Sequence, residues 1–337
     1  LRLTLITGNA PGNDMRFYNE RVESSRNFAN KVWNASRFIM MNMEDKVISK
    51  PDEADLEVTD KWILSKVNTL AKDVTENMEK YELGIAVQKV YDFIWDEFCD
   101  WYIELVKYRI YHSDENYKSA NAALWTLKTV LGNALKMLHP FMPFVTEEIY
   151  SALVPEEKSL MMSDWPQFTE DWCYADAENI TDHMKEVIRG VRNARAEMNV
   201  PPSRKAKVYV VCEDEKLCEG FEELTTCACP LMSASELAIQ ADKAGIADDA
   251  VSIVVPDASV YVPLEELIDF EQEIERLTKE EEKLTKEINR AKGMLSNEKF
   301  VSKAPQAKVD EEKAKLEKYT QMMEQVKERL EALKAGR

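Results

Sequence analysis

The sequence is poor in the residues and motifs on which most catalytic sites depend. It has 9 glycines and 3 histidines among 337 residues, and it contains no glycine-rich dinucleotide-binding loop and no Walker lysine motif. No arrangement of serine, histidine and aspartate fits a hydrolase triad. We therefore expect no catalytic residue and no bound metal in this chain, and we assign His112, His139 and His183 to packing or to helix ends.

Cysteine pairs and long apolar runs are also missing. The six cysteines include no C-x-x-C pair, and they lie far from the histidines, which disfavours both a zinc site and a disulfide framework. No apolar run approaches the roughly 18 residues of a membrane span, and no segment resembles a signal peptide. We expect a soluble, reduced, cytoplasmic protein without a membrane partner.

The first residues, "LRLTLITGNAPGND", begin without Met inside an apolar run that is typical of a strand. Gly8, Pro11 and Gly12 would end this strand. A chain that starts in the middle of such a run is expected to be a piece of a longer protein, so part of the function would reside elsewhere.

The formal net charge of -18 would disfavour a nucleic-acid partner, but the charge is unevenly distributed. Residues 2–37, 185–207 and 283–308 carry local charges of +3, +5 and +5. Three basic islands on an acidic body can attract a polyanion to chosen places and repel it from others. The competing explanation is that ordinary solvated helix faces happen to cluster.

Apolar residues recur at helical spacing through most of the first half of the chain. We predict helices from about residue 19, at 60–81 with Asp60 as the N-cap, at 83–109, at 121–138 and at 146–153. Their lengths and short links indicate a helical bundle. Pro140 and Pro143 should interrupt the helical pattern between the last two.

After a helix at about 179–198, short alternating segments predict a small α+β unit of uncertain strand order. From residue 267 onwards, apolar residues step by three and four in two runs separated by about a dozen residues. This pattern predicts an antiparallel coiled-coil hairpin with arms of about 45 Å, and self-association into a longer bundle is the rival. The seam positions are Leu267, Phe270, Ile274, Leu277, Glu281, Leu284, Ile288, Ala291 and Leu295, then Val309, Glu312, Leu316, Tyr319, Met323, Val326, Leu330 and Leu333.

The helix that begins near residue 19 has two distinct faces. Its predicted buried face comprises Val22, Ala29, Val32, Trp33, Ser36, Ile39, Met40 and Met43. Asn27, Lys31, Asn34 and Phe38 lie on the opposite side at spacings of four, three and four. An exposed ring flanked by amides and a cation suits unstacked RNA bases, whereas the alternative is that Phe38 packs under another segment.

Two further groups of cations have a functional and a structural interpretation. Lys185, Arg189, Arg192 and Arg195 crowd one face of the 179–198 helix. Their partner is either RNA backbone phosphate or the acidic surface of a neighbouring domain. A last basic group surrounds the turn of the hairpin, where phosphate contact competes with an ordinary solvated tip. Its members are Lys286, Arg290, Lys292, Lys299, Lys303 and Lys308.

Several segments together resemble the C-terminal part of bacterial valyl-tRNA synthetases over essentially the whole chain. These segments are "LITGNAPGNDMRF", "RNFANKVWNASRF", "DKWILSKVN", "YDFIWDEFCDWYIELVK", "LHPFMPFVTEEIY", "IRGVRNARAEMNVPPSRKAKV" and "NEKFVSKAP". The first two and the hairpin with "NEKFVSKAP" point to the valine enzymes, whereas the third to fifth are shared with the class I enzymes for isoleucine and leucine.

The resemblance implies a mainly α fold in four parts. These are the end of the catalytic core and stem-contact region (1–18), a helical anticodon-binding domain (19–175), a helix with a small α+β connector (176–265) and a coiled-coil tRNA-binding arm (266–337). The nucleotide fold with its H-I-G-H and K-M-S-K-S motifs and the editing domain would precede Leu1, and neither motif occurs in this chain.

By the same resemblance, the chain would bind tRNA(Val) as part of a monomeric ligase that uses ATP and Mg²⁺ in its full-length form. Lys31 and Phe38 would meet anticodon bases, and the hairpin would touch the outer corner of the tRNA where the D and T loops meet. The chain has Glu20 where family members often have a basic residue, and Arg21 would substitute for it. The alternatives are a helical scaffold or coiled-coil interaction module, or the same part of an isoleucine or leucine enzyme.

Overall fold

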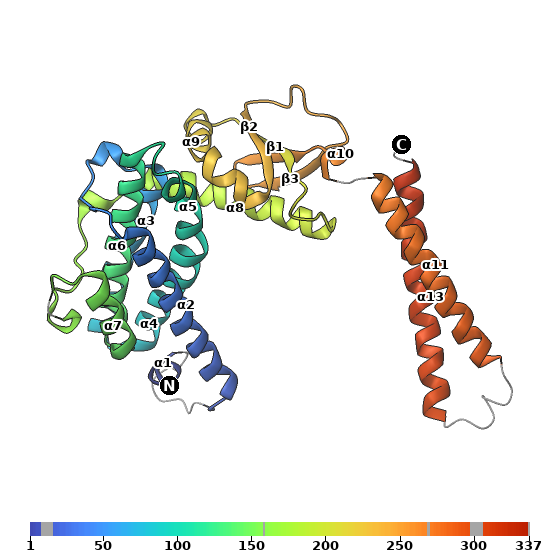
Figure 1. Cartoon of the computed structure of the whole chain (residues 1–337), viewed down its shortest axis with the longest axis horizontal. Coiled ribbons are helices and arrows are strands. Elements are labelled where there is room, and N and C mark those ends of the chain that lie inside the picture. The colour runs from blue at the N-terminus through green and yellow to red at the C-terminus, as the bar shows by residue number, and fades with distance from the viewer. Residues whose placement is uncertain (8–15, 158, 268–269, 297–305, 336–337) are drawn as a thin grey trace. The chain divides into compact units, whose positions relative to one another are not determined.

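The structure is a computed structural model that describes residues 1–7, 16–157, 159–267, 270–296 and 306–335. It divides into two compact units, Leu1–Val262 and Pro263–Arg337. The first unit is a helical bundle joined to a small mixed sheet, and the second contains a long helical hairpin (Figure 1). Among the described residues, no helix is both long and apolar enough to cross a membrane.

The predicted helical bundle is confirmed, with boundaries that differ by a few residues. Its elements are α1 (Arg2–Ile6), α2 (Asn19–Met43), η1 (Glu53–Asp55), α3 (Val58–Glu79), α4 (Leu83–Asp92), η2 (Phe93–Tyr102), α5 (Ile103–Tyr111), α6 (Tyr117–Leu138), α7 (Pro143–Leu153), η3 (Leu160–Met162) and η4 (Glu170–Trp172). Large side chains such as Trp62, Phe98 and Leu127 are fully buried between these helices. Their burial supplies the apolar core that stabilises the bundle.

The prediction of a strand at the start of the chain is wrong, because residues 2–6 form the short helix α1. Leu3 and Thr4 are buried, and the Thr4 hydroxyl lies 2.7 Å from the Ser25 hydroxyl of α2. A strand needs neighbouring strands for its backbone hydrogen bonds, and all described strands lie between residues 206 and 262. In a helix, the segment satisfies its backbone groups locally while still burying Leu3.

The prediction of Asp60 as a helix N-cap also needs correction. Helix α3 begins at Val58, Glu57 is its N-cap, and Asp60 completes a capping box from the third helical position. The Arg109 guanidinium donates to both Asp60 carboxylate oxygens, at 2.8 and 2.7 Å, and the Tyr102 hydroxyl donates at 2.7 Å. This fully buried carboxylate therefore joins the start of α3 to η2 and α5. Although burial alone would lower the pKa of Arg109, Asp60 raises it above the ordinary value.

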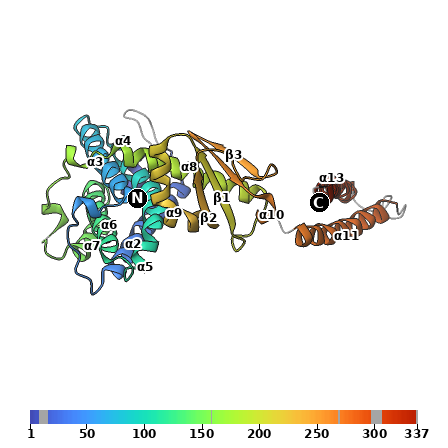
Figure 2. The same cartoon turned by 90° about the horizontal axis from the view of Figure 1, so that it is seen from above.

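The remainder of the first unit is an α+β arrangement, as predicted. It consists of α8 (Ala175–Glu197), β1 (Ala206–Cys212), α9 (Glu215–Met232), β2 (Ala234–Gln240), β3 (Val251–Val255) and β4 (Ala258–Val262). The strand order is β2-β1-β4-β3, with β1 and β2 parallel across α9 and the other neighbours antiparallel. Helix α8 packs against α3 of the bundle and also against α9 and β3 (Figure 2). It therefore joins bundle and sheet.

The expectation of wholly reduced cysteines is wrong for one pair. Cys212, at the end of β1, and Cys218, in the first turns of α9, form a disulfide with their Cα atoms 6.3 Å apart. The tight β1–α9 link brings them together, although a spacing of six residues matches none of the common motifs. Cys99, Cys173, Cys227 and Cys229 are free thiols.

The second unit confirms the predicted hairpin. After α10 (Leu264–Leu267), helices α11 (Phe270–Leu295) and α13 (Gln306–Ala335) pack side by side (Figure 1). Among the seam positions with described side chains, six are buried, namely Leu267, Leu284, Ala291, Val309, Val326 and Leu330. The polar seam residue Glu281 lies 4.0 Å from the Lys327 ammonium of the facing helix, so its charge is partly compensated.

Candidate nucleic-acid interface

Helix α2 presents the face that the sequence predicted to contact RNA. Asn27 and Asn34 are exposed and Arg21 lies exposed in the first turns, whereas Lys31 and Phe38 are half-buried. The structure therefore keeps Asn27, Lys31, Asn34 and Phe38 on one side of α2 but partly covers the lysine and the ring.

The buried side of α2 is rotated relative to the prediction. Phe28, Val32, Ser36 and Ile39 are buried, while Trp33 is 41% exposed, so the assignment of Trp33 to the core is wrong. Phe28 is drawn inwards because its ring stacks on Tyr91 with centroids 4.3 Å apart. Spacing along α2 alone could not reveal this partner, which comes from another helix.

An aromatic column connects α2 with the end of α4 and with η2. The rings of Tyr91 and Trp95 lie within 3° of parallel with centroids 5.8 Å apart, and Phe28 stacks at 4.3 Å from Tyr91. The Lys31 ammonium lies 3.7 Å from the centre of the Trp95 ring and 2.6 Å from a carboxylate oxygen of Asp100. A cation–π contact and an ion pair together hold the end of this lysine.

The geometry of η2 explains how Trp95 and Asp100 reach the same lysine. The sequence predicted one continuous α-helix over 83–109, but residues 93–102 form a π-helix between α4 and α5. Its hydrogen bonds span five residues, so side chains at i and i+5 lie nearer to one face than they would in an α-helix. Trp95 and Asp100 have this spacing. Local π-helical geometry is frequently found at functional sites.

The surroundings of Lys31 are acidic. Partial burial and the carboxylates of Asp92, Asp100 and Glu97 raise the pKa of Asp96, whereas the Lys31 ammonium acts in the opposite direction. A phosphate group placed here would meet several carboxylates and a lysine that already has a counter-ion. The middle of the α2 face is therefore poorly suited to the RNA backbone and better suited to a base.

At the far end of the α2 face, Phe38 has two neighbours from α5 that the spacing along α2 did not predict. The Tyr111 ring of α5 stands at 85° to the Phe38 ring with centroids 6.4 Å apart, and the Lys107 ammonium is 5.8 Å from the centre of the Phe38 ring. Tyr111 is 59% exposed. The alternation of cations and aromatic residues in "KYRIYH" (107–112) was the available signal, because such interleaving is typical of nucleic-acid surfaces.

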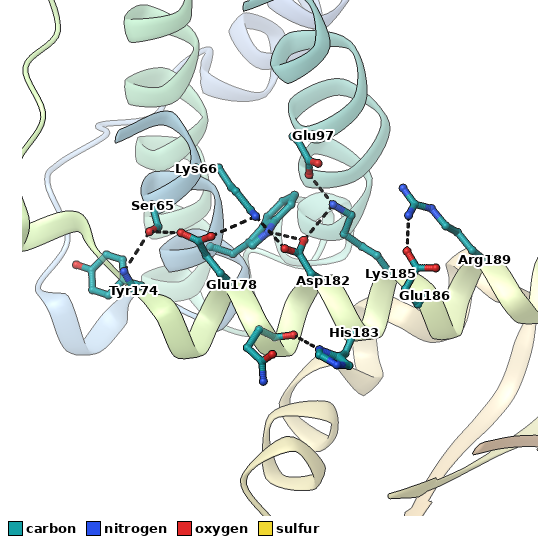
Figure 3. A network of polar contacts seen from close by, with 12 residues as sticks. Ser65, Lys66, Glu97, Tyr174, Glu178, Asp182, His183, Lys185, Glu186 and Arg189 are labelled. Carbon is teal, nitrogen blue, oxygen red and sulfur yellow. Dashed lines mark hydrogen bonds and ion pairs between the residues drawn. The ribbon is translucent and has the colours of Figure 1, made fainter. Parts of the chain in front are cut away.

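The cations of α8 have a different setting (Figure 3). The Lys185 ammonium donates to Glu97 at 2.5 Å and to Asp182 at 3.2 Å, and it lies 4.8 Å from the centre of the Trp62 ring. Lys185 and Arg195 are buried, and Arg195 donates to the carbonyl oxygens of Pro201 and Arg204. Buried cations with these partners stabilise the fold.

Arg189 and Arg192 are exposed but also have partners within the chain. Arg189 pairs with Glu186, and Arg192 donates to the Leu231 carbonyl oxygen of α9 at 2.6 Å. Their guanidinium groups lie 5.3 and 5.7 Å from the centre of the Trp101 ring. Burial lowers the pKa of Arg192, which Glu104 partly offsets. Of the two partners considered for this face, the structure supports contacts within the chain.

The structure describes four of the six hairpin cations. Lys286, Arg290 and Lys292 are exposed on α11, and Lys308 is exposed on α13. Arg290 is 3.8 Å from Glu287. Lys299 and Lys303 lie outside the described residues. The four described cations are available on the surface of their own unit.

Comparisons with known proteins match both units. The family model of the anticodon-binding domain of tRNA ligase matches residues 60–210, and that of the valyl tRNA synthetase tRNA binding arm matches residues 269–334. The first match covers α3 to β1, so α2 precedes it.

Curated relatives match the chain over almost its full length. The valine-tRNA ligase of Clostridium tetani (strain Massachusetts / E88) is 51% identical over 335 residues, and that of Clostridium perfringens (strain 13 / Type A) is 51% identical over 334 residues. Each match covers 99% of this chain and 38% of the relative, at its C-terminal end. A LeuRS from Agrobacterium radiobacter K84, solved in a ternary complex with tRNA, is 15% identical over 52% of this chain and 20% of its own, with a TM-score of 0.39.

Proposed function

This chain belongs to the valine-tRNA ligase family, as its C-terminal region, and from that premise we propose that it binds tRNA(Val) and positions it for the attachment of valine. The enzyme of which it would form part uses ATP and Mg²⁺, bound by the catalytic domain that this region assists. The observation that carries the proposal is the presence, in one chain, of matches to an anticodon-binding domain and to a valyl tRNA synthetase arm.

The anticodon would be recognised on the exposed face of α2. Unstacked bases can stack on the Phe38 ring, and the amides of Asn27 and Asn34 can donate to and accept from base edges. Arg21, exposed at the start of the helix, can contact a flanking phosphate. Support comes from the exposure of the two amides and from the aromatic neighbours of Phe38.

The hairpin would contact the tRNA elbow through its cations. Lys286, Arg290, Lys292 and Lys308 are exposed, and the sequence places Lys299 and Lys303 in the link between the two helices. Lysine and arginine contacts to phosphate position a nucleic acid without reading its sequence. The arm would thus contribute affinity, and the bundle would contribute selectivity.

The mechanism of this region is positioning. Two contacts at separated points on the tRNA fix its orientation, so that binding energy lowers the entropic cost of bringing the acceptor end to the catalytic site. Its other partners would be the catalytic and editing domains of the same polypeptide. We place the enzyme in the cytoplasm as a monomer.

Direct binding measurements with the full chain test this proposal. We expect tRNA(Val) to bind more tightly than tRNA(Ile) or tRNA(Leu), with an affinity that falls steeply between low and moderate salt because counterions are released. Equal binding of all three would contradict anticodon recognition. No binding at low salt would favour the scaffold or protein-interaction alternative, and better competition by tRNA(Ile) or tRNA(Leu) would favour the related enzymes.

The arm can be tested separately by charge reversal. Lys286→Glu with Arg290→Glu should weaken the binding of every tRNA by a similar factor, because phosphate contacts do not depend on sequence. Lys318→Glu, at an exposed position on α13, is the matched control and should have less effect. A loss confined to tRNA(Val) would show that the two substituted residues read sequence instead.

A further inference from the structure

The cation at the centre of the α2 face already has a counter-ion. The Lys31 ammonium lies 2.6 Å from Asp100 and 3.7 Å from the centre of the Trp95 ring, and its side chain is only 22% exposed. The Asp100 side chain is 52% exposed, so the pair stands at the surface with its carboxylate accessible. Both residues can therefore be reached by a ligand without rearrangement of the core.

This arrangement changes what Lys31 can recognise. A free lysine attracts any phosphate of a nucleic acid, because the attraction is electrostatic and independent of sequence. A lysine paired with a carboxylate adds little net charge to the surface. Asp92 and Asp96, on the turns that precede Asp100, add further negative charge and repel a phosphate backbone.

A base edge, unlike a phosphate, is recognised by adjacent hydrogen-bond donors and acceptors and does not need a net positive charge. Exposed bases carry hydrogen-bond donors and acceptors next to each other, as in the amino group and ring nitrogen of adenine. Lys31 can donate and Asp100 can only accept, and the two groups lie within one hydrogen-bond length. The pair therefore offers a donor and an acceptor to one base edge while remaining nearly neutral overall.

We propose that Asp100 is a specificity-determining residue of the α2 face, which holds Lys31 over Trp95 so that the pair binds the edge of an unstacked base and does not attract phosphate. This inference rests on the proposed function and adds the residue that suppresses sequence-independent binding. Asp100 acts both as an acceptor for the base and as a positioning residue for Lys31. The π-helical turn is what brings Asp100 and Trp95 to the same lysine.

The decisive variant is Asp100→Asn in the full chain. Binding is measured for tRNA(Val) transcripts with the native anticodon and with a replaced anticodon, over a series of KCl concentrations. We expect the ratio of the two affinities to fall by about tenfold, since a lost base-edge contact has that order of effect. Binding of the replaced transcript should strengthen, and the slope of log affinity against log salt should steepen by about 0.7 as Lys31 becomes free to contact a single-stranded phosphate.

Two comparisons separate this role from a simple change of charge. Asp96→Asn removes the same charge four residues away on the same helix, and it should change the affinity ratio much less. In a Lys31→Met background, Asp100→Asn should no longer steepen the salt slope, because the cation that Asp100 restrains is gone. Thermal melting of each variant, followed by circular dichroism, checks that the bundle remains folded.

The outcomes distinguish the inference from the function on which it rests. If the wild-type chain shows no anticodon preference, the proposed function fails and the inference falls with it. If the wild type discriminates but Asp100→Asn keeps the same affinity ratio and salt slope, only the inference is overturned. An Asp96→Asn effect as large as that of Asp100→Asn would also overturn it.

Discussion

Helices α2 and α8 carry similar cations in the sequence, but these cations differ in their exposure and in their partners. Lys31 of α2 keeps 22% of its side chain exposed beside an exposed carboxylate, whereas Lys185 of α8 keeps 5% and lies against Glu97 and Asp182. A cluster of cations on one helix face therefore does not reveal whether their partners belong to the same chain or to another molecule.

The difference follows from where each helix lies in the first unit. Helix α8 contacts α3 of the bundle and also α9 and β3, so neighbours occupy several of its sides. Helix α2 contacts α6, α7 and η2 and leaves Asn27 and Asn34 exposed. A helix between two layers turns its charges towards the same chain, and a helix at an edge can present them to a ligand.

The largest expected effect is loss of stability on replacing Lys185. Lys185→Met would remove the cation that Glu97 and Asp182 share, while Lys66 would still pair with Asp182. We expect unfolding to become easier by about 2 kcal/mol, below the range for fully buried pairs because both carboxylates are partly exposed. Lys31→Met is the matched control and should cost less than about 1 kcal/mol. Urea unfolding measures both, and equal losses would contradict the contrast between the helices.

A smaller loss is expected where α9 approaches α8. A Cβ added at Gly220 would lie 2.6 Å from two atoms of Ile180, so Gly220→Ala should destabilise the protein by about 1 kcal/mol despite the better helix propensity of alanine. Gly293→Ala in α11 meets no atom within 4 Å and should be neutral or stabilising. A lower melting temperature for Gly220→Ala with an unchanged or higher one for Gly293→Ala would support tight packing around α8. A higher melting temperature for both variants would contradict it.

The smallest expected effect concerns stability in acid. Burial alone would raise the pKa of Asp182, but Lys66 and Lys185 lower it below its ordinary value of 3.8. Because the folded-state pKa is the lower one, Asp182 stabilises the protein above pH 3.8, and this contribution is lost as the pH falls through the folded-state value. In Asp182→Asn, the free energy of unfolding should fall less steeply as the pH drops below about 3.8. Asp248→Asn, in an exposed loop, should leave that pH dependence unchanged.

The elements with strong periodicity were predictable from the sequence, and those that depend on distant partners were not. The bundle helices, the short alternating segments of the α+β unit and the hairpin follow from local patterns. Pro143 begins α7 at a position where proline loses no hydrogen bond. The helical conformation of residues 2–6 depends on burial of Leu3, and the π-helix replaces a pattern that suits an α-helix equally well. Local periodicity therefore predicts neither the helix at residues 2–6 nor the π-helix.

The same limit applies to the candidate site. Spacing alone placed Lys31 and Phe38 on one face, but their partners Asp100 and Tyr111 lie 69 and 73 positions further along the chain. Spacing likewise grouped Lys185 with Arg189. It could not reveal that Lys185 donates a hydrogen bond to Glu97 of η2. Which cations are free is decided by tertiary packing.

The proposed function assigns anticodon recognition to the α2 face, whereas the α8 cations have their partners within the chain. The most direct test is the ratio of affinities for tRNA(Val) with its native and with a replaced anticodon, measured side by side for Phe38→Ala and Arg189→Ala. We predict that Phe38→Ala lowers this ratio by about fivefold, the lower part of the range for a lost base stack, and that Arg189→Ala leaves it unchanged. A ratio that falls only for Arg189→Ala, or for neither variant, would contradict the account.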